Sequence, residues 1–274
     1  MDHRSPQSVH KAASTTGPAA HAGQGMEDWV LLRGLTRASA HWGGFIAELE
    51  VCLLARVIAL DLPGNGTLWQ QRSPSSVAGM VQHCREQLRQ QGIHHPVGVL
   101  AMSLGGMVAA EWAWRHPSEV RSLVLVNTSM RPFSPFWQRL RPVAMVRLLA
   151  ARVLRADAAT LEQEILRLTT RHPRHGVLQS WCDESTRHPV SGINTLRQLL
   201  AAARYRAPLQ APAMPTLVLS GAGDRLVSPQ CSRAVAQHWK VPLHMHGTAG
   251  HDLTLDAGPW VAEQVRQFIA STTP

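Results

Sequence analysis

The sequence predicts an α/β fold, in which a mostly parallel β-sheet is flanked by helices and interrupted by a helical insertion. Short apolar runs alternate with longer segments whose apolar residues recur at helical spacing, which is typical of a parallel sheet covered by helices. Between residues 132 and 208 this alternation stops, because all apolar stretches there have helical spacing. We therefore expect a core formed by residues 28–131 and 209–274, with residues 132–208 as a helical lid.

The length and the terminal composition narrow the class of protein. A chain of 274 residues is long enough for one large core with an insertion. Residues 1–27 are rich in Ser, Thr, Ala, Gly, Pro and His, so we expect a flexible tail, with an organelle transit peptide as the alternative. This tail has no apolar stretch typical of a secretory signal, and no run in the chain approaches the roughly 18 apolar residues of a membrane helix. We therefore expect a cytoplasmic protein with no membrane span.

The charged and metal-binding residue types form no binding motif. The formal net charge is +9, but only two of the 27 basic residues are lysines and the arginines are spread over the chain, so we expect no nucleic-acid partner. The cysteines Cys52, Cys84, Cys182 and Cys231 form no C-x-x-C pair, which favours free thiols. The histidines lack metal-ligand spacing, so we expect no metal. The oligomeric state stays open.

The expected elements follow from the same patterns. Six apolar runs are predicted strands, over residues 29–35, 56–60, 96–102, 122–127, 216–220 and 241–246. Helical spacing predicts core helices over residues 77–91, 107–115, 229–239 and 260–269. Inside the insertion, the same spacing predicts helices around residues 143–153 and 161–168, with prolines at the joints.

The third predicted strand runs into A-M-S-L-G-G, residues 101–106. A nucleophilic serine on a sharp turn between a strand and a helix exposes its hydroxyl, and the turn requires small residues two positions before and two after it. Ala101 and Gly105 meet this requirement around Ser103, although glycine is more usual at the first position. Taken alone, the motif fits two roles for Ser103 equally well, a nucleophile or the N-cap of the following helix.

Two later residues favour the nucleophile. A catalytic serine needs a base that accepts its proton and an acid that orients the base. Asp224 follows the strand predicted at 216–220, and His251 follows the next one, so acid and base come in the order serine, acid, histidine. Asp252 also adjoins His251, but adjacent side chains seldom point at each other, so Asp224 is the better candidate for the acid.

Six motifs in order resemble the α/β-hydrolase superfamily. They are L-L-R-G-L-T-R at 31–37, A-L-D-L-P-G-N-G at 59–66, L-A-M-S-L-G-G-M-V-A at 100–109, R-H-P-S-E-V-R-S-L-V-L-V-N at 115–127, L-V-L-S-G-A-G-D-R-L-V-S-P at 217–229 and G-H-D-L at 250–253. The chain is most similar to the small capped serine hydrolases of that superfamily, which include carboxylesterases such as the pimeloyl carrier-protein methyl ester esterases. The family usually has eight strands, and this chain accounts for six.

The resemblance implies site residues and a reaction. Ser103 matches the nucleophile, His251 the general base and Asp224 the orienting acid, while the backbone N–H groups of Leu35 and Leu104 match the oxyanion hole. No cofactor is implied. Arg33 replaces a histidine of the family, and we expect it to have a structural role, the alternative being a cation near the pocket.

The substrate is less determined. Carboxylic esters are the expected class, and thioesters, lactones or amides are alternatives that the same residues could serve; a non-catalytic protein that binds an acyl ligand is a further alternative. Phe133, Phe136 and Trp137 either line an acyl pocket or pack within the lid. Arginines concentrated in the insertion could attract a carrier-bound acyl substrate instead of a free small molecule.

Overall fold

The computed structural model describes residues 27–153, 157–172 and 175–272. The tail expected over residues 1–27 lies outside the described residues except for Glu27.

Six parallel strands form one sheet in the described part of the chain, in the order β2-β1-β3-β4-β5-β6. They are β1 (Asp28–Leu32), β2 (Arg56–Leu60), β3 (Val97–Met102), β4 (Val120–Val126), β5 (Thr216–Gly221) and β6 (Leu243–His246). The predicted parallel α/β fold is confirmed. The first strand ends at Leu32 and not at residue 35, because the chain turns there and the Arg37 backbone N–H donates to the Gly34 carbonyl oxygen over 3.2 Å.

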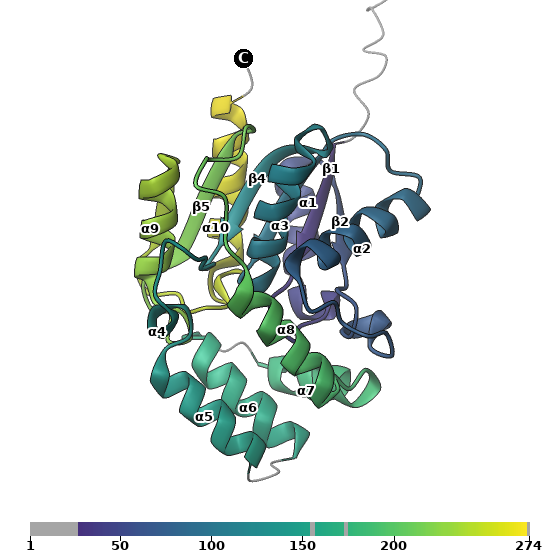
Figure 1. The fold of residues 1–274 in the computed structure, drawn as a ribbon, viewed down its shortest axis with the longest axis vertical. Coiled ribbons are helices and arrows are strands. Elements are labelled where there is room, and N and C mark those ends of the chain that lie inside the picture. Colours follow the sequence, from purple (N-terminus) through teal and green to yellow (C-terminus); the bar gives the residue numbers. More distant parts are fainter. Residues whose placement is uncertain (1–26, 154–156, 173–174, 273–274) are drawn as a thin grey trace, which may run out of the picture.

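Helices cover both faces of this sheet (Figure 1). On one face α1 (Phe45–Leu53) and α10 (Leu253–Thr272) pack over Leu31 and Leu100. On the other face α2 (Val77–Gln90), α3 (Leu104–Arg115) and α9 (Pro229–Trp239) pack over Val30 and Val99. The residues of β1, β3 and β5 are buried on both faces, so the core consists of two apolar layers with the sheet between them.

One core helix was not predicted, and two were predicted too short: α3 begins at Leu104 and not at residue 107, and α10 also begins earlier than expected. α1 was not predicted, although Phe45 and Leu49 lie one helical turn apart and are both buried. α10 begins before the predicted residue 260, because two helical stretches meet at a kink at Ala257, just before Pro259. A proline inside a helix removes a backbone donor and bends the axis, so the spacing alone indicated only the later stretch.

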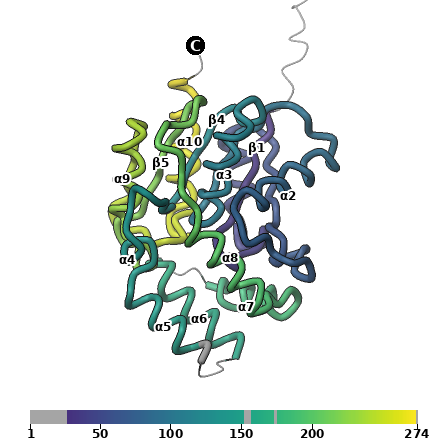
Figure 2. The backbone as a smooth tube through the Cα atoms, viewed as in Figure 1, coloured from purple at the N-terminus to yellow at the C-terminus, as the bar shows by residue number. Residues whose placement is uncertain are grey.

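Five helices lie between β4 and β5 in the described residues: α4 (Phe136–Arg139), α5 (Pro142–Val153), α6 (Ala158–Thr169), α7 (Val177–Arg187) and α8 (Gly192–Arg204). Figure 2 shows the chain leaving the sheet after β4, passing through this group and returning to β5. The two ends of the insertion meet. The backbones of Arg131 and Arg206 form an isolated parallel β-bridge, and the Ala207 N–H donates to the Arg131 carbonyl oxygen over 2.7 Å.

Within the described ranges, none of the helices is both long enough and apolar enough to cross a bilayer.

Candidate active site

Ser103 occupies a sharp turn between β3 and α3. Its φ of 55° and ψ of −117° lie in a region that residues with side chains seldom adopt. The turn is fixed on both sides, because the Ser103 N–H donates to the Val126 carbonyl oxygen and its own carbonyl oxygen accepts from Thr128 Oγ1 over 2.8 Å. Ser103 is partly exposed, whereas Met102 and Leu104 are buried. The backbone therefore holds the serine at the carboxyl end of the sheet.

Small residues make this turn possible. A Cβ at Gly105 would lie 2.5 Å from the Leu32 carbonyl oxygen, closer than any side chain tolerates. A Cβ at Gly34 would lie 3.0 Å from Ser103 Cβ, so the loop after β1 also passes close to the serine. Ala101, at the position where glycine is more usual, is fully buried in β3.

His251 and Asp224 come together at the ends of β6 and β5. His251 Nδ1 lies 2.7 Å from Asp224 Oδ2, and both side chains are almost completely buried. The other Asp224 oxygen, Oδ1, accepts the backbone N–H groups of Leu226 and Val227, each over 2.8 Å. The carboxylate is thus fixed by the loop that carries it, and it leaves His251 Nε2 as the ring nitrogen available for a second partner.

Asn127, at the end of β4, ties the acid and histidine loops together. Its Nδ2 group donates to the carbonyl oxygens of Gly250 (3.0 Å) and His251 (2.7 Å), and its Oδ1 accepts from the Gly221 N–H at 2.9 Å. Thr128, the next residue, holds the Ser103 carbonyl oxygen. Two consecutive residues after β4 therefore contact the backbones of both Ser103 and His251. In the described residues no hydrogen bond joins the Ser103 hydroxyl to the His251 ring.

The two predicted oxyanion donors lie on the elements that flank Ser103. Leu104 is the first residue of α3, where a backbone N–H has no acceptor within its own helix. Leu35 lies in the loop after β1, one residue after Gly34. This loop contains Thr36 at a φ of 55°, and the Thr36 N–H donates to Gln198 Oε1 over 2.9 Å.

Gln198 brings α8 of the insertion into contact with this loop. It is fully buried, and its Nε2 group donates to Asn65 Oδ1 over 2.8 Å and to Ser73 Oγ over 3.1 Å. All of its hydrogen-bonding groups thus have partners in the core. Neither Gln198 nor Asn127 was predicted as a site residue, because a single buried amide carries no recognisable sequence motif.

Arg33 and Asp252 form a buried bidentate ion pair beside the site. Arg33 Nη1 and Nη2 donate to the two Asp252 oxygens over 3.1 and 2.6 Å, and the guanidinium carbon lies 4.8 Å from the Trp42 ring centroid. Burial acts to raise the pKa of Asp252, but the charge and hydrogen bonds of Arg33 outweigh it, so the pKa lies below its usual value. Asp252 therefore forms its ion pair with Arg33, whereas Asp224 is the carboxylate that contacts the His251 ring.

A second buried ion pair joins the core to the insertion. Arg37 Nη1 and Nη2 both donate to Glu162 Oε2 of α6 over 2.8 Å, and the Arg37 guanidinium lies over the Trp181 ring of α7 at 4.3 Å. Arg37 Nη1 also lies 2.9 Å from His41 Nε2. Burial lowers the pKa of His41 below its usual value, and the charges of Arg37 and Arg33 act in the same direction, so this ring is neutral and accepts from Arg37.

The three aromatic residues predicted at the acyl pocket lie in different surroundings. Phe133 contacts the His238 and Trp239 rings at centroid distances of 4.5 and 5.6 Å, next to the core layer. Phe136 and Trp137 on α4 contact each other edge to face, with 74% and 53% of their surfaces exposed. Among the described residues, no cluster of three or more His, Cys, Asp or Glu side chains could hold a metal ion.

Comparison with known proteins identifies relatives over most of the chain. A family model described as the alpha/beta hydrolase fold matches residues 30–257. The pimeloyl-[acyl-carrier protein] methyl ester esterase of Methylococcus capsulatus is 28% identical over 263 residues, which cover 89% of this chain and 94% of that protein. The 2-hydroxymuconate semialdehyde hydrolase of Pseudomonas putida is also 28% identical, with 78% of this chain and 77% of that protein covered.

A solved structure shares the fold at lower identity. A thermophilic esterase from Thermogutta terrifontis superposes with a TM-score of 0.72 at 21% identity, and the match covers 92% of each chain.

Proposed function

This chain belongs to the α/β-hydrolase fold family and is a hydrolase, and we propose that it cleaves carboxylic esters through an acyl-enzyme intermediate formed on Ser103. His251 is the proposed general base and Asp224 the residue that orients it. The backbone N–H groups of Leu35 and Leu104 are the proposed oxyanion hole.

The proposed reaction has two halves. Ser103 Oγ attacks the ester carbonyl carbon while His251 Nε2 takes its proton, and the Asp224 carboxylate stabilises the resulting imidazolium through Nδ1. The negative charge on the carbonyl oxygen is stabilised by the two backbone N–H groups, each typically worth about 3 kcal/mol in the transition state. His251 then gives its proton to the departing alcohol. In the second half, His251 takes a proton from water, which attacks the carbonyl carbon of the acyl-enzyme. The bond to Ser103 Oγ then breaks, His251 returns the proton to this oxygen, and the acid leaves.

The observation that carries this proposal is the His251–Asp224 hydrogen bond of 2.7 Å at the same end of the sheet as the strained Ser103 turn. A buried carboxylate on Nδ1 fixes the ring and leaves Nε2 for the serine. The missing hydrogen bond between Ser103 and His251 is compatible with this role, since catalytic hydrogen bonds are often long before substrate binds.

The substrate we propose is a small or carrier-bound acyl ester. Several curated relatives are named as pimeloyl-[acyl-carrier protein] methyl ester esterases. Arg167 and Arg187 of the insertion are 60% and 67% exposed and lie 4.0 and 3.9 Å from Glu164 and Glu184, and such exposed arginines would favour an acidic carrier. In this proposal the insertion acts as the lid, and Phe133 is the best placed of the three aromatic residues to line an acyl pocket, because it is partly buried. A cytoplasmic location fits the four free cysteines.

The test combines a covalent probe with turnover. A fluorophosphonate probe should label the wild-type chain at Ser103, and Ser103→Ala should lose labelling and at least roughly 1000-fold in kcat/KM on p-nitrophenyl esters. Ser180→Ala, an exposed serine on α7, is the matched control and should keep both. Ester hydrolysis at the wild-type rate by Ser103→Ala would overturn the proposal. A panel of p-nitrophenyl esters of rising chain length, acyl thioesters and lactones then ranks the substrate classes.

A further inference from the structure

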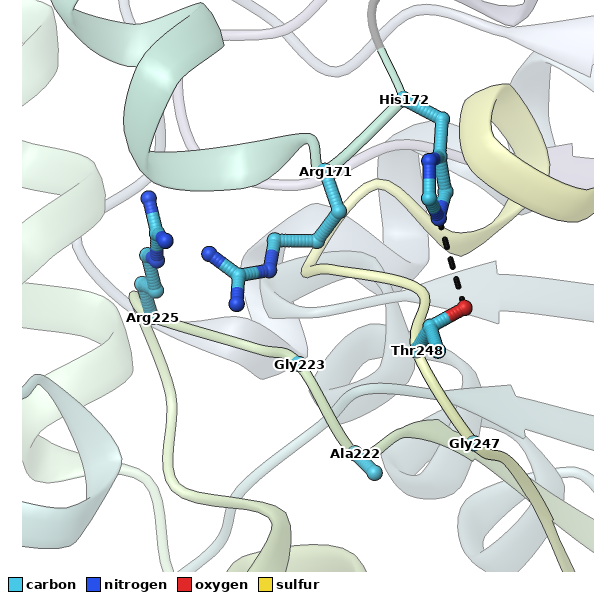
Figure 3. Close-up of a pocket in the computed structure, with 7 residues that line it drawn as sticks. All are labelled: Arg171, His172, Ala222, Gly223, Arg225, Gly247 and Thr248. Atoms are coloured by element: carbon cyan, nitrogen blue, oxygen red, sulfur yellow. Dashed lines mark hydrogen bonds between the residues drawn. The ribbon is translucent and has the colours of Figure 1, made fainter.

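A pocket of about 510 Å³ lies beside the His251 and Asp224 loops (Figure 3). Three segments line it: residues 171 and 172 after α6, residues 222, 223 and 225 after β5, and residues 247 and 248 after β6. None of them belongs to the proposed catalytic machinery, although Arg225 directly follows Asp224. The pocket is therefore a separate feature on the rim of the site.

Its side chains are strongly cationic. Figure 3 shows the Arg171 guanidinium reaching toward the side chain of Arg225, above Gly223, and both arginines line the pocket. Neither guanidinium has an ion-pair or hydrogen-bond partner among the described residues, whereas Arg33, Arg37 and Arg85 each contact a carboxylate. Two neighbouring guanidinium groups repel each other unless an anion lies between them.

Asp256, the carboxylate that contacts the segment carrying Arg171, forms no ion pair with either guanidinium among the described residues, and its oxygens are used elsewhere. Asp256 accepts the backbone N–H groups of Arg171 (2.9 Å), His172 (3.1 Å) and Gly250 (2.7 Å), and also the Thr170 hydroxyl. Asp256 thus fixes the backbone of the segment that carries Arg171, and the charged head group of that arginine stays free.

The rest of the lining adds shape and polar groups. A Cβ at Gly223 would lie 2.3 Å from the Thr248 carbonyl oxygen and 3.1 Å from Arg171 Nε, so the floor of the pocket requires glycine. His172 Nε2 lies 3.3 Å from Thr248 Oγ1, which places a ring nitrogen and a hydroxyl together on one wall. The pocket therefore combines two guanidinium groups with two smaller polar groups.

We propose that this pocket binds the phosphate group of a larger anionic molecule. Guanidinium groups match phosphate oxygens in pairs of parallel hydrogen bonds, and two of them balance a phosphate dianion better than the single charge of a carboxylate. The volume exceeds that of phosphate alone, so the remainder of the ligand occupies the open side. The proposal does not rest on the proposed esterase activity.

The test measures the stabilisation of the full chain by phosphate. Thermal unfolding is followed against sodium phosphate at constant pH and ionic strength, with sodium chloride as compensating salt. The wild-type chain should show a saturable rise in Tm, and phenyl phosphate should act at least as strongly as inorganic phosphate. Arg171→Gln and Arg225→Gln should each weaken the apparent affinity by roughly tenfold. Arg233→Gln, an exposed arginine on α9, should leave it unchanged.

Three outcomes would overturn this proposal: no saturable response in the wild-type chain, a wild-type response in the Arg171→Gln/Arg225→Gln double variant, or an equal response to acetate. The Tm of each variant in chloride alone shows whether it is folded. Phosphate binding should persist in Ser103→Ala, and p-nitrophenyl acetate hydrolysis should persist in the double variant. The esterase proposal and the phosphate proposal can therefore fail separately.

Discussion

Ser103 combines an unfavourable backbone conformation with a crowded environment. A non-glycine residue at a φ of 55° and ψ of −117° typically costs about 1–3 kcal/mol, and such strain persists only where the surroundings hold it. The Val126 carbonyl oxygen and Thr128 Oγ1 hold this turn from β4 and the residues after it. Gly105 and Gly34 provide the space that the turn requires.

Gly105→Ala should destabilise the protein, because the new Cβ would lie 2.5 Å from the Leu32 carbonyl oxygen. Overpacking against backbone typically costs 1–3 kcal/mol, so we expect a Tm lower by roughly 5 °C. Gly44→Ala is the control, since a Cβ there meets no atom within 4 Å. A Tm for Gly105→Ala equal to that of the control would show that the turn tolerates a side chain.

Gln198 is a positioning residue for the proposed oxyanion loop, because it accepts the Thr36 N–H next to Leu35. Gln198→Ala should lower kcat on p-nitrophenyl esters by roughly 10- to 100-fold, with a smaller effect on KM, since a misplaced donor weakens the transition state most. Gln198→Glu keeps an acceptor for Thr36 and should recover part of kcat. Equal losses in both variants, with unchanged kcat/KM for Gln267→Ala on α10 as control, would contradict this positioning role.

The sequence indicated the candidate site residues that lie in chemical motifs and did not indicate the residues that support them. Ser103, Asp224 and His251 could be placed because each follows a recognisable strand, and the structure brings Asp224 and His251 into contact. Asn127 and Gln198 each use one buried side-chain amide to hold the backbone of a site loop, at His251 and at Thr36. Their partners are far away in the sequence, so no local pattern indicates them.

Among the elements, α2, α3 and the turn before β4 are linked by one carboxylate. Glu119 accepts from Arg85 Nε and Nη2 of α2 over 2.7 and 2.6 Å and from Trp112 Nε1 of α3 over 2.8 Å. The hydrogen bonds from Arg85 and Trp112 lower the pKa of Glu119 to about 2, against the opposing effect of partial burial.

This shift predicts a pH-dependent contribution to stability. The pKa of Glu119 is lower in the folded protein than its usual value of 4.5, so the stabilisation is complete above about pH 4.5 and is lost as the pH falls toward 2. In urea unfolding, Glu119→Gln should be less stable than the wild type at pH 7, and this difference should shrink between pH 4.5 and pH 3. Glu86→Gln, exposed on α2, is the matched control. A constant difference from pH 7 to pH 3 would argue against the Glu119 contacts.

Helices and strands were predicted best where one pattern of apolar residues, helical spacing or a continuous run, extends over the whole segment. The inner strands β1, β3, β4 and β5 each contain a continuous apolar run. α2 was placed correctly because Val77, Val81, Cys84 and Leu88 share one face. The predicted end of β1 was wrong because Leu35, an apolar residue counted with the strand, lies in the turn that follows it. The start of α10 was wrong because Pro259 interrupts the helical pattern there.

In the whole molecule, the insertion is anchored to the core by buried polar contacts in addition to apolar packing. The Arg37–Glu162 pair is about 9% exposed on each side, and Gln198 is fully buried. Burial lowers the pKa of Arg37, and the charge of Glu162 opposes this effect. A buried charge is tolerated only with its partner, so each side of this contact depends on the other.

Glu162→Ala should therefore destabilise the whole chain strongly. It leaves Arg37 buried without its counter-ion, which typically costs about 3–5 kcal/mol in chemical denaturation. Glu263→Ala removes a carboxylate from the exposed pair with Arg266 and should cost far less, because water screens this pair. The Arg37→Met/Glu162→Leu double variant should recover much of the loss. If Glu162→Ala and Glu263→Ala unfold at the same urea concentration, the buried pair does not anchor the insertion.

The meeting of the two ends of the insertion, at Arg131, Arg206 and Ala207, has a consequence for protein engineering. The chain leaves and rejoins the core at adjacent points. A replacement segment therefore has to span the same short distance between these points, whatever its length. The insertion can therefore be exchanged as one unit. Helices from a relative with another substrate preference could be grafted at these positions while the Ser103 turn and the Asp224–His251 pair stay in place. The graft must also supply new partners for the core groups that the present helices satisfy, among them Arg37, Thr36 and the Ser73 backbone N–H.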